Sequence, residues 1–344
     1  MLKYAPYLLG ILLLMGSGCA DKGSKSDSPA DTSNAVTLKP SDFYFVGMID
    51  YYPGLYKYNF KTKEAEKFWS VKGEKIVDLS FSDNRKTAFF LTAKEFGKRG
   101  VFPFIKRVKL YRLDVDSSKV DFIRTVGSGM QVFTEWEADN SYKVILNSLD
   151  KIVANYVDQH TFIYSRFGKE LVNESKTYDI TKEGYPKPPV PKVVFNSEGG
   201  DTVEAAADSS MYSVYLINSK SGSKTVLAKS SQKLKDAEWG TGGGCIIFST
   251  LDISPRNETI YNKRPNTSKL FIYSLSSKKI IKKWEGGGVK NFFIDADYVI
   301  FDNGFGPSSI LKIFNYKTME PFDTVKIEGG CGVSNIPQIP DFSA

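Results

Sequence analysis

Three glutamates beside tryptophans are the side chains with the clearest capacity for chemistry. Glu135 and Glu137 flank Trp136, and Glu238 precedes Trp239 at the matching place of a similar segment. Both segments are predicted β-strands, and residues two apart share one face of a strand. Such carboxylates can act as acid and base in glycoside hydrolysis or hold a cation through oxygen ligands. Because the pattern does not recur throughout the chain, we favour solvated charges at a channel wall or at strand ends over catalysis.

Other residue types that usually catalyse reactions or bind metals are scarce. His160 is the only histidine, and no Gly-x-Ser-x-Gly segment accompanies it to indicate a Ser-His-Asp arrangement. One histidine with Cys245 and Cys331 cannot supply the ligand spacing of a zinc site. We therefore expect no metal and no cofactor. We also expect both cysteines to be buried free thiols, with a disulfide between them as the alternative.

Charge-mediated binding is a second kind of chemistry, concentrated in a predicted long connection at residues 93–108. Basic and aromatic side chains alternate there, and Glu95 is the only acid among them. This mixture can dock an anionic partner such as a protein surface, a lipid headgroup or an acidic glycan. The alternative is a solvated hairpin tip whose phenylalanines fold back onto the sheet. The predicted partner-binding residues are Lys94, Lys98, Arg99, Phe102, Phe104, Lys106 and Arg107.

The amino-terminal segment predicts export. Lys3 precedes an apolar run at residues 7–15, which is shorter than the roughly 20 residues needed to span a bilayer. Small residues then lead directly to Cys19. This arrangement resembles a bacterial lipobox, which implies a signal peptide at residues 1–18 and lipidation of Cys19. Since Gly16 stands where the lipobox usually has Leu or Val, an ordinary secretory signal cut after Ala20 is the alternative.

Residues 19–41 are expected to form the lipidated cysteine and a flexible polar tether. Two or more acyl chains would hold the protein stably on a membrane. Enterobacterial lipoproteins retained in the inner membrane carry Asp after the cysteine, so Ala20 implies, by that resemblance, an outer-membrane location facing the periplasm. Removal of the signal peptide would remove Lys3, and the formal net charge of the mature chain would be +6, which is a mild charge for its length. This charge and the export signal both argue against a nucleic-acid partner.

Residues 42–344 predict an all-β domain built from a repeat. Short alternating strands are separated by Asn, Asp, Gly and Ser turns, and no stretch sustains a helical period for three turns. An aromatic strand followed by a turn recurs at Phe81, Trp136, Phe195, Trp239 and Phe293. Hairpins recur in step, starting at Leu55, Leu110, Phe162, Val214, Leu270 and Leu311. Six hairpins therefore accompany five aromatic strands.

The missing sixth strand is expected at the carboxyl end, in residues 335–343, where Phe342 continues the rhythm. The pattern then resumes at Phe43. We thus predict a six-bladed β-propeller closed by pairing of the C-terminal strand with the N-terminal blade. The repeat resembles that of TolB-like six-bladed propellers, and this resemblance implies a fold more than a function.

The sequence as a whole predicts a membrane-anchored cell-envelope lipoprotein whose propeller is a non-enzymatic binding or scaffold module for a protein or envelope component. The alternative is a glycan-active hydrolase or lyase that uses the three glutamates. Long connections are expected at 93–108, 148–160 and 251–268, and we place the partner-binding surface there because binding residues concentrate on loops carried by a rigid scaffold.

Overall fold

The computed structural model describes most of the chain between residues 39 and 328, and all the described residues belong to one compact unit. The described ranges are 39–50, 52–82, 84–99, 102–137, 139–148, 155–184, 195–196, 200–208, 211–230, 233–251, 269–284, 289–303 and 308–328. The predicted signal peptide, Cys19, most of the tether, Cys331 and the predicted strand at 335–343 lie outside these ranges. Residues 252–268, which make up most of the third predicted connection, also lie outside the described ranges.

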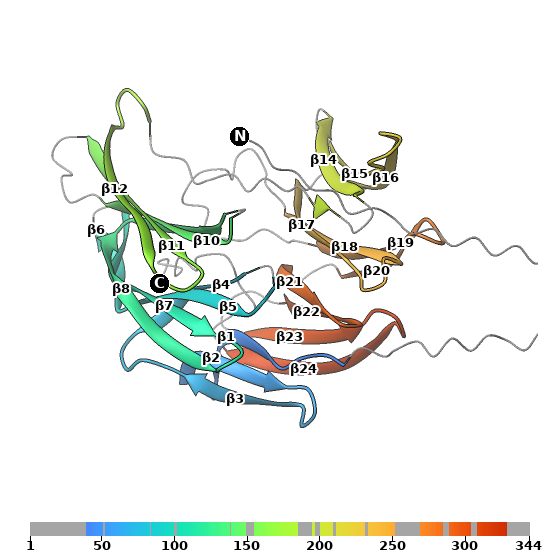
Figure 1. The fold of residues 1–344 in the computed structure, drawn as a ribbon, viewed down its shortest axis with the longest axis horizontal. Helices are drawn as coiled ribbons and strands as arrows, with labels where there is room; N and C mark the ends of the chain where they lie inside the picture. Colours follow the sequence, from blue (N-terminus) through green and yellow to red (C-terminus); the bar gives the residue numbers. More distant parts are fainter. Residues whose placement is uncertain are drawn as a thin grey trace, which may run out of the picture. The chain divides into compact units, whose positions relative to one another are not determined.

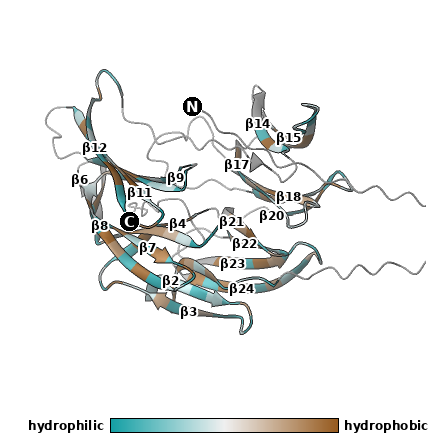
Figure 2. Cartoon of the chain, viewed as in Figure 1, coloured by the Kyte–Doolittle hydropathy of each residue, from teal (hydrophilic) through white to brown (hydrophobic). Residues whose placement is uncertain are grey.

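Every regular element in the described residues is a β-strand, and all strand pairs are antiparallel (Figure 1). The predicted all-β class is therefore confirmed. Apolar and polar residues alternate along many strands (Figure 2), as expected where each strand packs on a face. Within the described ranges there is no helix with the length and apolar character needed to cross a bilayer.

The strands fall into six consecutive groups. Group one has β1 (Phe43–Ile49), β2 (Tyr52–Asn59) and β3 (Glu64–Trp69). Group two has β4 (Lys75–Phe81), β5 (Thr87–Ala93), β6 (Glu95–Arg99), β7 (Phe102–Asp114) and β8 (Lys119–Gly129). Group three has β9 (Gln131–Trp136), β10 (Ser141–Ser148), β11 (Tyr156–Ser165) and β12 (Glu170–Asp179).

Group four has β13 (Phe195–Asn196), β14 (Thr202–Asp208), β15 (Met211–Ile217) and β16 (Lys224–Ser230). Group five has β17 (Lys233–Trp239), β18 (Cys245–Leu251), β19 (Lys269–Ser274) and β20 (Lys279–Trp284). Group six has β21 (Val289–Asp295), β22 (Tyr298–Asn303), β23 (Ser308–Asn315) and β24 (Glu320–Glu328). Groups one and six join into one seven-stranded sheet through a single pair, Met48 with Glu328.

All six predicted hairpins are present as consecutive antiparallel strand pairs: β2–β3, β7–β8, β11–β12, β15–β16, β19–β20 and β23–β24. The long connection predicted at 93–108 contains regular structure, in agreement with the hairpin alternative. This segment is a hairpin, because β7 starts at Phe102 and pairs with β6 before it pairs with β5. The connection predicted at 148–160 is shorter than expected, since β11 already begins at Tyr156 and pairs with β10.

Apolar clusters join neighbouring groups. Phe89 of group two stacks on Tyr142 of group three with 4.6 Å between ring centroids. Phe293 of group six meets Phe43 of group one edge-on at 5.4 Å. Further clusters join groups one and two, four and five, and five and six. Each fully buried large apolar side chain contributes about 1.5–3 kcal/mol, so these shared clusters are the main cohesion between groups.

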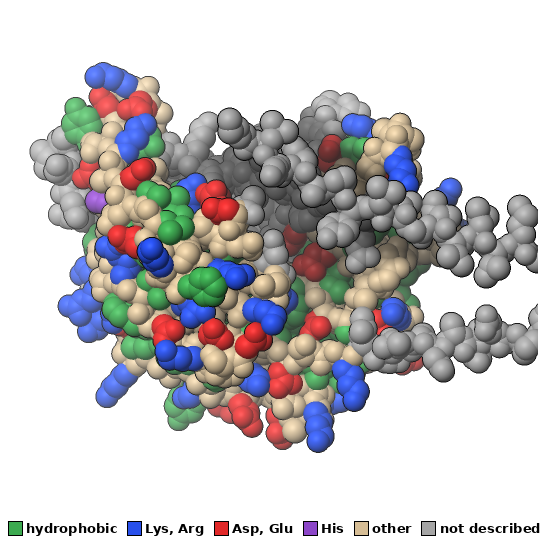
Figure 3. All heavy atoms as spheres, in the orientation of Figure 1, with side chains coloured by type: hydrophobic (Ala, Val, Ile, Leu, Met, Phe, Trp, Pro, Cys, Tyr) green, Lys and Arg blue, Asp and Glu red, His purple; other side chains and the backbone are tan. Residues whose placement is uncertain are grey.

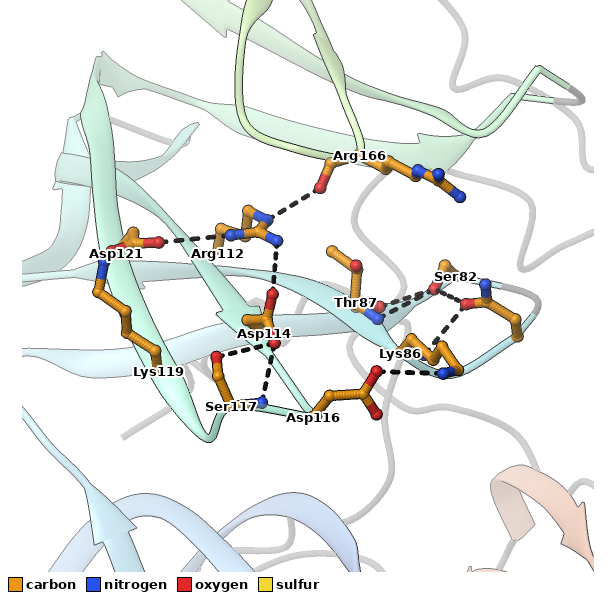
Figure 4. Close-up of polar contacts among 11 residues, drawn as sticks. Ser82, Lys86, Thr87, Arg112, Asp114, Asp116, Ser117, Lys119, Asp121 and Arg166 are labelled. Atoms are coloured by element: carbon orange, nitrogen blue, oxygen red, sulfur yellow. Dashed lines mark hydrogen bonds and ion pairs between the residues drawn. The ribbon is translucent and has the colours of Figure 1, made fainter.

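Polar contacts cross the same boundaries. The Tyr58 hydroxyl of group one donates to Asp323 of group six, and the Tyr316 hydroxyl of group six accepts from the amide of Thr241 in group five at 2.7 Å. Between groups two and three, Nε of Arg112 donates to the carbonyl of Arg166 at 2.9 Å (Figure 4). These bonds fix the spacing of sheets that the apolar clusters hold together.

Candidate functional site

Glu135 and Glu137, two of the predicted catalytic residues, share a single lysine. Nζ of Lys143 lies 2.9 Å from Oε1 of each glutamate. The strand register causes this, because Lys143 on β10 is paired with Glu135 on β9. The hydrogen bonds to Glu135 and then to Glu137 raise the pKa of Lys143. The ammonium group thus sits between the two carboxylates and compensates their charge.

Glu238, the third predicted catalytic residue, has different neighbours. It is half-buried on β17, and its Oε2 accepts a hydrogen bond from the amide of Ile294 at 3.0 Å. Burial raises the pKa of Glu238 to about 8, the charge of Asp236 adds to the rise, and the charge of Arg85 opposes it. The structure therefore brings Glu135 and Glu137 together and gives Glu238 a separate environment.

Arg85, which the sequence reasoning missed, links groups two, five and six. It lies in the turn after β4, and its Cζ is 4.3 Å from the ring centroid of Phe81 and 3.6 Å from that of Phe293. Burial lowers the pKa of Arg85 to about 10, whereas the charges of Glu238 and Asp295 raise it. The guanidinium is therefore still charged at neutral pH, and it lies against two aromatic rings.

A row of polar side chains crosses group three from its outermost to its innermost strand. The Tyr178 hydroxyl donates to Oε1 of Gln159 at 3.3 Å, and Nε2 of Gln159 donates to Oδ1 of Asn147 at 3.0 Å. Nδ2 of Asn147 then donates to Oε1 of Gln131 at 3.2 Å. We call these four residues the amide row. The sequence reasoning missed it, although pairing Gln131, Asn147 and Gln159 across the predicted hairpins would have aligned them.

Asp78 is a buried carboxyl between groups two and three. Its Oδ2 accepts hydrogen bonds from the hydroxyls of Thr134 and Tyr142, while no described group bonds to its Oδ1. Burial raises the pKa of Asp78 to about 7, and the two hydroxyls oppose that rise. The signal for this contact was absent from the sequence, because it depends on how two sheets pack.

The predicted basic segment is brought together on the hairpin of β6 and β7. Lys94, Lys106 and Arg107 are exposed, and Nζ of Lys106 lies 5.9 Å from the ring centroid of half-buried Phe104. The amide of Lys94 bonds to the carbonyl of Lys106 at 3.1 Å and closes the base of the hairpin. The backbone also places Lys98, Arg99 and Phe102 on this hairpin, but their side chains lie outside the description.

The remaining candidate residues form no reactive centre within the described ranges. His160 is half-buried on β11, and its ring lies 6.4 Å from that of Phe162. Cys245 is buried and free, and burial raises the pKa of its thiol to about 11. No group of three His, Cys, Asp or Glu side chains suited to a metal ion occurs in the part of the chain that the structure describes.

Comparisons with known proteins yield similar structures only. No protein-family model and no curated protein matches the sequence. Similar solved structures include TolB from Acinetobacter baumannii, at 10% identity and a TM-score of 0.41, with 84% of this chain and 64% of that chain covered. The chain therefore spans less than two thirds of that TolB.

The periplasmic gluconolactonase PpgL of Pseudomonas aeruginosa is also similar, at 11% identity and a TM-score of 0.41, with 86% of this chain and 99% of that chain covered. A nidogen/laminin complex gives 11% identity and a TM-score of 0.36, with 82% and 92% covered. The expected likeness to TolB proteins is thus found among solved structures.

Proposed function

We propose that this protein is a lipid-anchored cell-envelope protein whose β-domain binds a protein or another envelope component without catalysis. The anchor would be Cys19, and the protein would sit on the outer membrane facing the periplasm. The amino-terminal pattern of an apolar run, small residues and cysteine supports the anchor. The tether would let the domain reach partners at a distance from the membrane.

The domain itself would be a closed six-bladed β-propeller, with each strand group forming one blade. Six consecutive antiparallel groups support this proposal. The cluster shared by Phe43 and Phe293 is a further support, because it joins the first group to the last. In a closed ring the C-terminal strand at 335–343 would complete the first blade, which has three strands in the described residues where the other groups have four or more.

The observation that carries the binding function is the fifth strand of group two. In the described residues no other group has a strand beyond four, and the additional hairpin presents exposed Lys94, Lys106 and Arg107 beside Phe104. Elsewhere on the face seen in Figure 3, basic and acidic side chains are intermixed. A hairpin rich in cations and aromatic rings suits an anionic partner surface.

The alternative enzyme reading has weaker support. A glycosidase needs two carboxyl groups placed on either side of one bond, with one of them protonated. Glu135 and Glu137 are instead bridged by Lys143, and Glu238 is held by the amide of Ile294. The arrangement suits structural and binding roles for these side chains better than acid-base catalysis.

A charge reversal on the hairpin tests the binding function. We expect the change of Lys94, Lys106 and Arg107 to Glu to reduce cross-linking of the full-length protein to its partner in isolated membranes at least tenfold. Partners would be identified by mass spectrometry after capture of the wild-type protein. The matched control changes the exposed lysines 61, 220 and 278 to Glu, which alters net charge equally. Equal loss in both variants, or no loss in either, would contradict the proposal.

The anchor is tested separately. Cys19→Ser removes the acceptor for lipid, so we expect the protein to move from the membrane fraction to the soluble periplasmic fraction. Metabolic labelling with a radioactive fatty acid should mark the wild type only. Unchanged membrane recovery together with absent labelling in both forms would exclude lipidation at this residue.

A further inference from the structure

The outermost strand of group three, β12, has a long free edge (Figure 1). It stands at the end of its sheet, and no described strand pairs with its outer side. From Val172 to Asp179 it pairs with β11 without an irregularity, so this stretch is regular and extended. The residues from Asn173 to Thr177 are all exposed. Such an edge presents a row of backbone donors and acceptors to another chain.

The other outermost strands of the described residues are less suited to pairing. β3, β16 and β20 are shorter than β12, and the like charges of β20 would repel a second copy. β8 departs from regular pairing with β7 at three places. β24 contains Pro321, which cannot donate a backbone hydrogen bond, and it meets β1 at Glu328. The free edge of β12 is therefore the longest regular one that the structure describes.

The charged residues of β12 are complementary to themselves about Ser175. When a second β12 lies antiparallel with Ser175 opposite Ser175, each Glu174 lies opposite the Lys176 of the other copy. Directly opposite residues project from the same face of a sheet, so both pairs are within reach of an ion pair. Nζ of Lys176 lies 3.7 Å from Oε2 of Glu183, and both side chains are exposed. Because such a pair contributes little, Lys176 can turn toward the second copy.

The remaining residues of the same register also match. Asn173 lies opposite Thr177 of the other copy, and Val172 lies opposite its Tyr178. Pairs of hydrogen-bonding side chains, and a β-branched residue beside an aromatic ring, both stabilise antiparallel strands. The ring of Tyr178 is held in place, because its hydroxyl donates to Oε1 of Gln159 at 3.3 Å. No two like charges lie directly opposite each other in this register.

We propose that two copies of this chain associate through their β12 strands, which pair antiparallel about Ser175 and join the two group-three sheets into one. Backbone hydrogen bonds between the strands hold the copies together, and the two Glu174–Lys176 pairs select the register. An edge contact is small, so the dimer is expected to be weak, as are interfaces below about 1,200 Å². This surface differs from the β6–β7 hairpin, and the inference therefore goes beyond the binding function proposed above.

A different occupant fits this edge less well. An extended peptide from another protein can also add a strand to a sheet edge. The charges of β12 match their own reversed order, however, and this match favours a second copy. Capture of another protein by the edge would contradict the proposal.

Cysteine cross-linking of the full-length protein in cells tests the register. Ser175→Cys places two thiols opposite each other across the twofold axis. Cα atoms of directly opposite residues are about 4.5–5.5 Å apart in antiparallel strands, which is a separation that a disulfide spans. With copper phenanthroline as the oxidant, we expect Ser175→Cys to give about tenfold more covalent dimer than the wild type, which carries the same native cysteines.

Asn173→Cys and Thr177→Cys are the matched controls. Each of these residues lies opposite the other and about 13 Å along the strand from its own counterpart, so neither variant should form the dimer alone. When both variants are produced in one cell, they should cross-link to each other as Ser175→Cys does. A random collision between exposed thiols would not show this pattern.

Charge reversal tests the ion pairs in the Ser175→Cys background. Lys176→Glu places two glutamates opposite each other at both positions, so the yield of dimer should fall about tenfold. Glu174→Lys should have a similar effect. The variant that carries both changes restores opposite charges and should recover the dimer. Equal melting temperatures would show that the variants are folded.

Several results would overturn the proposal. These are a dimer yield from Ser175→Cys no higher than that of the wild type, an equal yield from Asn173→Cys alone, capture of another protein in place of a second copy, or no recovery when the charges are exchanged. If Ser175→Cys does not fold, the joint production of Asn173→Cys and Thr177→Cys carries the same test. Because the β6–β7 hairpin is unchanged in all these variants, failure here is distinguishable from failure of the partner test on that hairpin.

Discussion

Glu135 and Glu238 occupy the same place in the repeat, one residue before a tryptophan, yet their surroundings differ. Glu135 stays partly exposed and shares Lys143 with Glu137. Glu238 is held by the amide of Ile294, and burial raises its pKa to about 8. Equal sequence position therefore places both glutamates on the same strand and face of their groups, whereas the surrounding side chains decide whether the carboxyl meets a lysine or a backbone amide.

The difference has a physical origin in the neighbouring side chains. Around Glu135 the register of a single hairpin supplies a cation at hydrogen-bonding distance. The cation that acts on Glu238, Arg85, comes from another sheet and lies over Phe81 and Phe293. The cation beside Glu135 thus depends on one hairpin. The cation that acts on Glu238 depends on the packing of three strand groups.

The largest expected effect is at Arg85. Arg85→Ala removes a guanidinium that lies against two aromatic rings, so we expect a loss of about 3 kcal/mol in the free energy of unfolding at neutral pH. Urea unfolding at neutral pH measures it. Arg124 also lies over a ring, 4.3 Å from Phe162, but at a more exposed position. Arg124→Ala should cost about 1 kcal/mol, and equal losses would remove the distinction between the two regions.

The next effect is the pH dependence of Glu238. Its pKa is raised from 4.5 to about 8, so the folded protein keeps a proton that the unfolded chain releases between these values. This contribution therefore makes stability fall as pH rises from about 4.5 to 8. Glu238→Gln should remove that decline and gain at least about 1.4 kcal/mol over the wild type at pH 8.5, the equivalent of one pKa unit.

Melting temperatures between pH 5 and 8.5 check this prediction. Asp78→Asn offers a comparison, because the pKa of Asp78 is raised to about 7. The loss of stability that Asp78 causes with rising pH should therefore end near pH 7. A Glu238→Gln variant whose melting temperature still falls with pH as steeply as the wild type's would show that Glu238 titrates normally.

The smallest expected effect is at Lys143. Lys143→Met leaves Glu135 and Glu137 without their shared cation, and partly exposed ion pairs contribute about 0.5–1 kcal/mol. Salt should shrink the difference between variant and wild type, because it screens the repulsion between the two carboxylates. Urea unfolding at low and high salt measures this. A loss of unfolding free energy larger than that of Arg85→Ala would contradict the expected order of the two effects.

Much of the fold follows from local pattern. The alternation of apolar residues and the turn residues predicted all six hairpins, including β2–β3 and β23–β24. The same alternation is present around Phe102 and Phe104, but because of Pro103 and the neighbouring charges the sequence predicted the β6–β7 hairpin only as an alternative to a loop. A proline is tolerated on such a hairpin because it lies at an edge.

The candidate site was predictable only in part. Lys143 could have been assigned to Glu135 by counting residues across the turn between β9 and β10. Asp78 and Arg85 could not, because their partners Tyr142 and Phe293 come from other sheets. Contacts across sheets depend on the packing of whole groups, and no spacing in the chain records them.

Gly129, where the chain crosses from β8 to β9, limits how this protein can diverge. A methyl group there would lie 2.4 Å from the carbonyl oxygen of Asn147 and 2.9 Å from a methyl of Leu146. Any larger residue would push aside the strand that carries Asn147 and so displace the side chains bonded to it. A glycine at this position is therefore expected in relatives that keep the amide row. A larger residue there would indicate that the row has been lost.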